Sequence, residues 1–398
     1  MNSTFFTFNR WEIDPPRPFR FFRNILNRIL PSKKAKGNKK NILLFVHSPM
    51  MLEFVHAIYE LIPKDGKFGF YCTGKYSPNE SQYLIEYCNE NDIKYIDPLS
   101  SSVCSWDLVI CAENIHEYWF RKNTPIVLHF HGIDSGKLVP NTNEIYRYAK
   151  ASQFTKTHSG KQLYKRIWEA SHYNKKVAEI RYPEISSSLK VVGDLRADQM
   201  LSMWKERKQI REQLGIKPDE KVILFGCTWG KESMMESMRH ELINEARKLK
   251  NKYRFIFSTH PQHWPPHQNN ATSIGLSLLK HEKEGFIIRR QPSSCLPYLI
   301  AADAAIVDFS STIVYQVLLK TPMACTPFPE HVIHEQSTRR SIYNACPHFS
   351  NPKDLEETIE HLLEINISEY KHLSHQILSY PGEAKKRIKK DLEINLLK

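Results

Sequence analysis

The stretch "ADAAIVDFSSTIVYQVLLKTPMACT", residues 302–326, contains a complete strand–helix–strand unit. The apolar run 304–308 predicts a buried strand, the pattern of 311–319 predicts a helix, and the apolar run 322–326 predicts a second strand. Two buried strands joined by a helix are typical of a parallel sheet that is covered on both faces. An acid, a ring and three hydroxyls at 308–312 therefore stand where a strand ends and a helix begins.

The same alternation runs through most of the chain and pauses once, at 179–188. Before the pause, strands are predicted at 41–46, 67–72, 92–96, 107–112 and 125–130, with helices at 50–62, 79–91 and 114–121. After it, strands are predicted at 189–193, 221–226, 253–258, 285–290, 304–308 and 322–326, with helices at 197–214, 231–250, 311–319 and 354–364. This pattern predicts an α/β fold of two doubly wound, Rossmann-like domains that face a cleft.

Four segments follow from this pattern. A basic arm occupies 1–40, the first domain 41–185 and the second domain 186–366. The charged, helical segment 367–398 could return to the first domain.

The composition is that of an ordinary soluble globular protein, with 41% hydrophobic and 25% charged residues among 398. No apolar run reaches the roughly 18 to 20 residues that span a bilayer, and the start lacks the pattern of a secretory signal. The eight cysteines are scattered without any CxxC pair, which favours buried, reduced thiols in the cytoplasm. Neither a zinc site nor any other metal site, and no cofactor, is expected.

The arm carries much of the net charge of +13, because residues 1–40 hold ten Lys or Arg against two acidic residues. In "RPFRFFRNILNRIL" (17–30) apolar residues recur at helical spacing with arginines mainly on the other side, and a basic run follows to residue 40. Such a helix is typical of a segment that lies on an anionic membrane surface, so residues 17–40 predict a peripheral location on the inner face of the cell membrane. A helix packed on the body, or a disordered basic tail, is the alternative. No nucleic-acid module is recognisable, so nucleic acid is not an expected partner.

Ligands of open parallel sheets bind outside the carboxyl ends of the strands. No dinucleotide fingerprint or Walker loop is present, which counts against a dehydrogenase or an ATPase. Polar residues instead follow four predicted strands: His131 in "HFHG", Thr228 in "CTWG", His260 in "STHP" and the group 308–312. An imidazole at a strand end is suited to proton transfer or to binding a phosphate oxygen, although a structural histidine is the commoner case.

The group 308–312 is the candidate anion site. Ser310 or Ser311 is predicted to cap the helix, whose first turn offers backbone N–H groups and the positive end of its dipole to a phosphate. Ordinary helix capping by the same hydroxyls is the alternative, as it is for Thr228. With no metal expected, cations such as Arg196 and Arg340 would meet the remaining phosphate charge.

The order "HFHG", "VGDLRAD", "CTWG", "STHP" and "ADAAIVDFSSTIVYQVLLKTPMA" resembles the CDP-glycerol glycerophosphotransferase family, over about residues 125–330. These are GT-B-fold enzymes that make teichoic acids and related capsules. The resemblance implies His131 as the catalytic base or another acceptor-side catalytic residue, His260 as a catalytic contact of the donor phosphate, and Ser310, Ser311 and Thr312 with Asp308 at the donor diphosphate. It places Arg196, Asp198, Thr228 and Trp229 along the donor cleft, and Arg340 where the family has an arginine.

This chain departs from the family pattern at several positions. Phe130 replaces a tryptophan, Leu195 and Cys227 replace prolines, and Tyr315 stands where an acidic residue is common.

The resemblance implies transfer of glycerol or ribitol phosphate from a CDP-linked donor to a hydroxyl of a lipid-linked or capsular glycan, without a metal. The first domain would then hold the acceptor and the second the nucleotide donor. A GT-B glycosyltransferase that uses a CMP- or UDP-sugar is the enzymatic alternative. A membrane-binding protein on a degenerate transferase scaffold is the non-enzymatic one.

Overall fold

The computed structural model describes residues 39–46, 49–74, 78–114, 124–130, 132–134, 136–139, 141–157, 162–265, 267–291, 293–365 and 371–397. The predicted basic arm therefore lies outside the described residues except for Lys39 and Lys40. The described chain divides into two compact units. The first unit takes its residues from 1–131, 153–167 and 388–398, and the second from 132–152 and 168–387.

The first sheet has seven strands: β1 (Lys40–Val46), β2 (Phe68–Gly74), β3 (Lys94–Tyr95), β4 (Leu108–Cys111), β5 (Ile126–His129), β6 (Tyr164–Glu169) and β7 (Leu189–Val191). Their order across the sheet is β3-β2-β1-β4-β5-β6-β7. Leu44 of β1 lies opposite Cys72 on one parallel neighbour and Ile110 on the other. This is the doubly wound arrangement that the alternating sequence predicts.

Two strands of this sheet differ from the prediction. The strand predicted at 189–193 is β7, and it belongs to the first sheet rather than the second. A six-residue 3-10 turn, Pro183–Ser188, leads directly into β7, and the Val192 amide donates to the Glu169 carbonyl of β6 (3.0 Å). The strand β6 itself was not predicted, because Lys165 and Arg166 interrupt its apolar pattern.

Helices α2 (Pro49–Tyr59), α3 (Pro78–Glu90) and α4 (Pro98–Val103) belong to the first unit, and α5 (Tyr146–Thr157) and α17 (Ala384–Asp391) contribute to both units. The chain's last described residues also belong to the first unit. There the Arg166 guanidinium lies 3.2 Å from the fully buried carboxylate of Asp391, which also accepts from the Asn395 amide (2.6 Å). Lys40 donates to the carbonyl of Leu397 (2.9 Å). Contacts between residues more than 200 positions apart thus attach the C-terminal segment.

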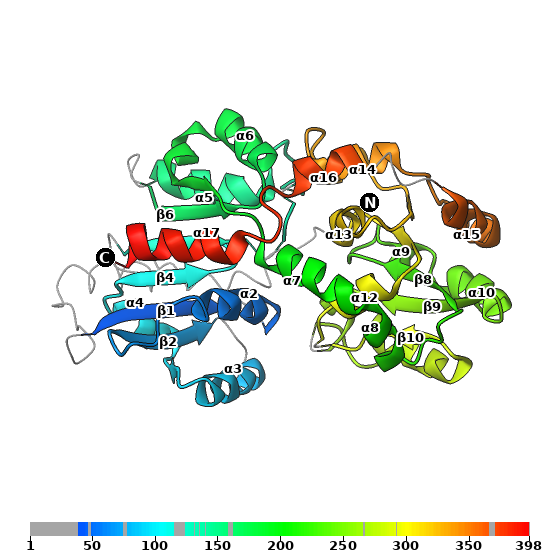
Figure 1. Cartoon of the computed structure of the whole chain (residues 1–398), viewed down its shortest axis with the longest axis horizontal. Coiled ribbons are helices and arrows are strands. Elements are labelled where there is room, and N and C mark those ends of the chain that lie inside the picture. Colours follow the sequence, from blue (N-terminus) through cyan, green and yellow to red (C-terminus); the bar gives the residue numbers. More distant parts are fainter. Residues whose placement is uncertain are drawn as a thin grey trace, which may run out of the picture. The chain divides into compact units, whose positions relative to one another are not determined.

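The second sheet consists of β8 (Lys221–Gly226), β9 (Tyr253–Ser258), β10 (Ile287–Ile288), β11 (Ala304–Val307) and β12 (Met323–Cys325). Their order is β10-β9-β8-β11-β12, and every neighbouring pair is parallel. Figure 1 shows helices packed around this sheet. The predicted strands of the second set other than β7 are all present, and each begins and ends within two residues of its predicted bounds.

Two groups of helices cover this sheet. One face carries α7 (Leu195–Met203), α8 (Arg207–Gln213), α12 (Leu296–Ala301), α13 (Thr312–Leu319), α14 (Thr338–Ala345) and α16 (Lys371–Ile377). The other carries α9 (Met234–Ser237), α10 (Arg239–Leu249), α11 (Ile274–Leu279) and α15 (Leu355–Glu364). The helix α6 (His172–Arg181) also belongs to this unit.

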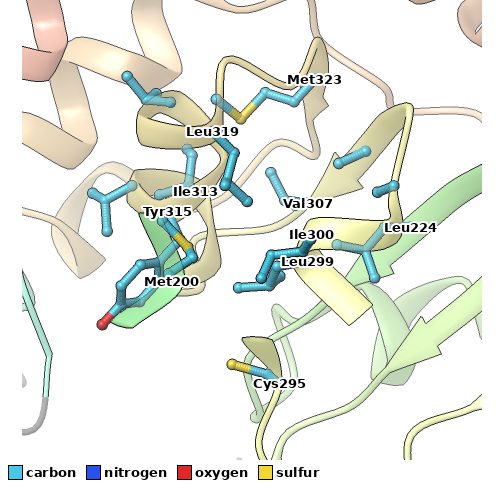
Figure 2. Packing of buried hydrophobic residues seen from close by; sticks show 14 of the residues in the cluster. Met200, Leu224, Cys295, Leu299, Ile300, Val307, Ile313, Tyr315, Leu319 and Met323 are labelled. Atoms are coloured by element: carbon cyan, nitrogen blue, oxygen red, sulfur yellow. The ribbon is translucent and has the colours of Figure 1, made fainter. Parts of the chain in front are cut away.

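Side chains of the central strands alternate between the two cores. Leu224 and Val307 enter the core of Figure 2, together with Ile313 and Leu319 of α13, whereas Phe225 packs into the opposite core. Successive strand residues point to opposite faces, so a strand covered on both faces must be apolar throughout. This explains the continuous apolar runs from which the sheet was predicted.

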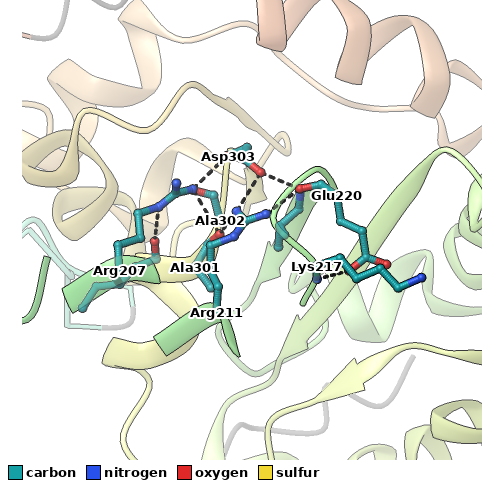
Figure 3. Close-up of polar contacts among 9 residues, drawn as sticks. Arg207, Arg211, Lys217, Glu220, Ala301, Ala302 and Asp303 are labelled. Atoms are coloured by element: carbon teal, nitrogen blue, oxygen red, sulfur yellow. Dashed lines mark hydrogen bonds and ion pairs between the residues drawn. The ribbon is translucent and has the colours of Figure 1, made fainter. Parts of the chain in front are cut away.

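A polar cluster fixes the starts of the two central strands (Figure 3). Asp303, just before β11, accepts from Arg207 (2.8 Å), from Arg211 (3.0 Å) and from the amide of Val222 on β8 (2.8 Å). Burial alone would raise the pKa of Asp303, but the hydrogen bonds from Arg207, Val222 and Arg211 outweigh it and hold the pKa below its ordinary value. The cluster holds β8 and β11 in register at the ends opposite the candidate site.

All eight cysteines are free, and seven of them are buried, as predicted for apolar core residues. Among the described helices, none is both long enough and apolar enough to cross a bilayer.

Candidate active site

The strand order of the second sheet changes direction between β8 and β11. Gly226 at the end of β8 lies opposite Val307 at the end of β11, and opposite Ser258 at the end of β9. The carboxyl ends of these three parallel strands therefore meet at the switch point where open α/β sheets bind ligands. They carry Thr228, Asp308 and His260.

Asp308 joins two of these strand ends. Its carboxylate is fully buried and accepts the backbone amides of Thr228 (2.8 Å), Ser310 (2.9 Å) and Met234 (3.2 Å). Burial raises the pKa of Asp308 to about 7, although these three amides and the nearby Arg339 act in the opposite direction. Both oxygens are thus used to organise backbone. Asp308, which was predicted to lie at the donor diphosphate, thus shapes the loop after β8 and the start of α13.

The helix α13 begins at Thr312, with Ser311 at the N-cap position. The hydroxyl of Ser311 makes no capping bond, whereas that of Ser310 accepts from the Thr312 amide (3.3 Å). The Thr312 hydroxyl is buried and has no hydrogen-bond partner among the described residues. A Cβ on Gly226 would lie 3.0 Å from that hydroxyl, so glycine at the end of β8 leaves room beside it.

His260 follows β9 and caps a one-turn 3-10 helix, Pro261–His263. Its Nδ1 accepts from the amide of Gln262 (3.1 Å), so in the neutral ring Nε2 carries the proton and is a hydrogen-bond donor. The ring lies 6.2 Å, centroid to centroid, from that of Trp229. His260 therefore has the tautomer needed to donate to a phosphate oxygen.

The predicted cap at Thr228 is wrong. The helix expected at 231–250 begins at Met234 and is broken at Met238, so Thr228 lies six residues before it. The hydrogen bond of Thr228 that shapes the site comes from its backbone amide, and its partner is Asp308.

The arginine of α14 that reaches the group 308–312 is Arg339, which the sequence analysis did not single out. Arg339 donates to the carbonyl of Phe309 (2.7 Å) and to the Asp134 carboxylate (2.9 Å). The neighbouring Arg340 donates to the carbonyls of Glu330 (2.8 Å) and Ile333 (3.0 Å). Arg339 lies three residues before the buried Ile342, and this helical spacing is the signal that could have distinguished the two arginines.

The segment "VGDLRAD" provides two further side chains of the predicted site. Arg196, at the start of α7, donates to the Cys295 sulfur (3.1 Å), and its guanidinium carbon lies 5.9 Å from the ring centroid of Tyr315 on α13. Asp198 accepts the amides of Gly382 (2.6 Å) and Ala384 (2.8 Å), so its carboxylate holds the start of α17.

The predicted base His131 lies outside the described residues, so its role stays a prediction. The preceding residue Phe130 is buried. His129, which the alternation of strand residues predicts on the same face as His131, is also buried. No cluster of three or more His, Cys, Asp or Glu suited to a metal occurs in the part of the chain that the structure describes.

Known structures share this fold. The wall teichoic acid polymerase TagF is 14% identical, with a TM-score of 0.65 over 95% of this chain and 93% of that one. A TagF variant soaked with CDPG is 13% identical, with a TM-score of 0.62 over 96% and 98%. The UDP-GlcNAc 2-epimerase from Neisseria meningitidis bound to UDP-GlcNAc is 15% identical, with a TM-score of 0.58 over 89% and 100%. No curated protein matched in the sequence comparison.

Two doubly wound parallel sheets, with polar strand ends gathered at a switch point, define an α/β protein of the GT-B type. The model of the family "CDP-Glycerol:Poly(glycerophosphate) glycerophosphotransferase" matches residues 34–361. The chain belongs to this family, which confirms both the resemblance and the fold class predicted from the sequence. It is accordingly a transferase.

Proposed function

We propose that this enzyme transfers glycerol phosphate or ribitol phosphate from a CDP-linked donor to a hydroxyl of a lipid-linked or capsular glycan. Membership of the glycerophosphotransferase family supports the donor class and the reaction. The TagF variant with the same fold was solved after soaking with CDPG, which also supports a cytidine donor.

The arrangement around Asp308 is the observation that supports the proposal at the level of individual residues. A buried carboxylate fixes the start of α13, so the positive end of that helix and the partly exposed Ser311 lie at the switch point, whereas Ser310 and Thr312 are buried and the Ser310 hydroxyl accepts the Thr312 amide. His260 adds a donor whose protonated nitrogen is set by Gln262. These groups suit the two phosphates of a nucleoside diphosphate.

The proposed step is a single in-line displacement. The acceptor hydroxyl attacks the β-phosphorus, a new phosphoester bond forms, and the bond to the α-phosphate oxygen breaks so that CMP leaves. His131 takes the proton of the attacking hydroxyl. His260 and the start of α13 stabilise charge on the phosphates, so the step is proposed to need no metal.

The direct test is release of CMP from CDP-glycerol or CDP-ribitol with a glycan acceptor, in buffer with EDTA. Turnover of either donor is expected. Phosphorus NMR of the product then separates this function from the glycosyltransferase alternative, because only alditol phosphate transfer leaves a phosphodiester in the product. Turnover of CMP- or UDP-sugars alone would overturn the proposal.

Histidine substitutions test the assignment of His260. We expect His260→Ala to lower kcat/KM about 100-fold or more, because one donor to a developing charge is lost. The exposed His240 on α10 offers a matched control, and His240→Ala should leave turnover unchanged. Equal activity of both variants would show that His260 does not contribute to turnover.

We also propose that residues 17–40 bind the protein to the anionic inner face of the membrane, which their amphipathic, basic sequence supports. Removing residues 1–38, which leaves strand β1 intact, should abolish sedimentation with anionic vesicles, while turnover on a soluble acceptor persists. Unchanged sedimentation of the truncated protein would contradict a membrane role for the arm.

A further inference from the structure

The segment that follows His131 is part of the second unit, although the sequence joins it to the last strand predicted in the first domain. The Leu138 amide donates to the Val332 carbonyl (3.0 Å), and the His334 amide donates to the Gly136 carbonyl (2.8 Å). Lys137 and Ile333 form an antiparallel bridge between these two bonds. The backbone around Lys137 is thereby fixed to the loop before α14.

Side chains fix the same segment at a second point. The carboxylate of Asp134 pairs with Arg339 at 2.9 Å, and the two side chains are only 2% and 8% exposed. Arg339 also donates to the carbonyl of Phe309, so one guanidinium connects this segment with the start of α13.

Gly136 allows the close approach. A Cβ on Gly136 would lie 2.4 Å from the Cβ of Ser337, whose hydroxyl caps α14 by accepting the Arg340 amide (3.0 Å). Every residue larger than glycine at this position would push the segment away from α14.

The side chain of Lys137 extends toward the residues after β8. Its ammonium nitrogen lies 5.1 Å from the ring centroid of Trp229, within the range of a cation–π interaction. Trp229 in turn lies beside His260. A fixed segment thus brings Lys137, a residue of intermediate exposure, to the tryptophan whose ring lies beside that of the proposed phosphate-binding histidine.

We infer that Lys137 binds the diphosphate of the donor, with Trp229 holding its ammonium group in place. An ammonium with three rotatable donors suits a phosphate that already accepts from an imidazole. Asp134 and Arg339 act as positioning residues for Lys137. The inference rests on the proposed function, because a cytidine diphosphate must first bind at this switch point.

Calorimetric titration with CDP and with cytidine tests this inference. Lys137→Met keeps the aliphatic stem on Trp229 and removes the charge, and it should weaken CDP binding about 10- to 100-fold. Cytidine affinity should stay within twofold, because cytidine has no phosphate. Lys137→Arg should restore part of the CDP affinity, and Lys250→Met, an exposed lysine of the same unit, should bind both ligands as the wild type does.

Two controls separate the possible failures. The thermal midpoint of Lys137→Met should match that of the wild type. If it does not, the titrations are repeated with Lys137→Gln, which keeps a polar end and should show the same selective loss of CDP affinity. Unchanged CDP affinity, or equal losses for CDP and cytidine, would overturn the role of Lys137 while wild-type CMP release still supports the proposed function. A wild type that neither binds CDP nor releases CMP would overturn both.

Discussion

The buried pair between Asp134 and Arg339 gives a sharp test of how the site is held together. Arg339→Met removes the guanidinium but keeps much of the side chain's length and apolar contact. The Asp134 carboxylate, which is only 2% exposed, then keeps the Gly136 amide of its own segment as a donor (3.0 Å). Arg339→Met also removes the hydrogen bond to the Phe309 carbonyl.

The expected cost follows from these losses. Breaking a buried ion pair by removing one partner costs about 3–5 kcal/mol, mainly because the other charge stays buried without compensation. Asp134→Asn should cost less, about 2 kcal/mol, since an amide oxygen still accepts from Arg339. The double variant removes both charges, so its cost should fall below the sum of the single costs by about 1–3 kcal/mol.

Hydrogen exchange of peptides from residues 304–320, measured at increasing urea concentrations, gives the free energy of unfolding of the second unit and hence this cost. Arg340→Met is the matched control on the same helix, because Arg340 is more exposed and donates only to two carbonyls. Its cost should be about 1–2 kcal/mol. An Arg339→Met variant within 1 kcal/mol of the wild type, or strictly additive single costs, would refute the reasoning.

Three further carboxylates give shorter tests, each read from urea midpoints of the wild type and the Asn variant. Asp303→Asn should cost about 2–3 kcal/mol at pH 7. Since the folded pKa of Asp303 is lowered, this cost should begin to shrink below about pH 4, where the unfolded carboxylate protonates, and should be lost only as pH falls further through the folded pKa. A cost that is already lost above about pH 4 contradicts the lowered pKa. Burial raises the pKa of Asp308 to about 7, so the stability of the wild type relative to Asp308→Asn should be highest near pH 4 and fall until about pH 7; a constant difference excludes this shift. Asp391→Asn should weaken the attachment of the C-terminal segment by about 3 kcal/mol and expose 388–397 to proteolysis, because Arg166 loses its buried partner. Unchanged cleavage would count against that role.

The central strands were predictable because burial on both faces leaves a local signature. The runs 221–226 and 304–308 are apolar at every or nearly every position, and each becomes a strand of the second sheet. The missed strand β6 lacks this signature. Its Arg166 pairs with Asp391, and no local pattern reveals a partner 225 residues away.

The strand ends of the site were predictable for a geometric reason, since parallel strands place their carboxyl ends on one edge. The sequence pattern therefore predicts that Thr228, His260 and Asp308 lie in one group. What each side chain does was less predictable. Asp308 was expected at the ligand and instead binds backbone amides, because its burial depends on how two separate loops pack over it.

The packing of the segment after His131 against the second unit could not be predicted from the sequence. Its partners are backbone groups of 332–334 and a buried arginine, and neither shows any periodic pattern in the sequence. The domain boundary predicted at 185/186 followed the pause in the strand–helix alternation. The compact second unit takes its residues from 132–152 and 168–387.

Asp308 also explains why cations matter at this site. A glycine-rich loop presents its backbone amides to phosphate, whereas here one buried carboxylate accepts the amides of Thr228, Met234 and Ser310. These amides are used within the protein. In the proposed function, the negative charge of a bound diphosphate would therefore be met by the start of α13, by Nε2 of His260 and by side-chain cations. Lys137, which lies beside Trp229 in the same unit, is the cation that we propose for this role, in place of the amides that Asp308 occupies.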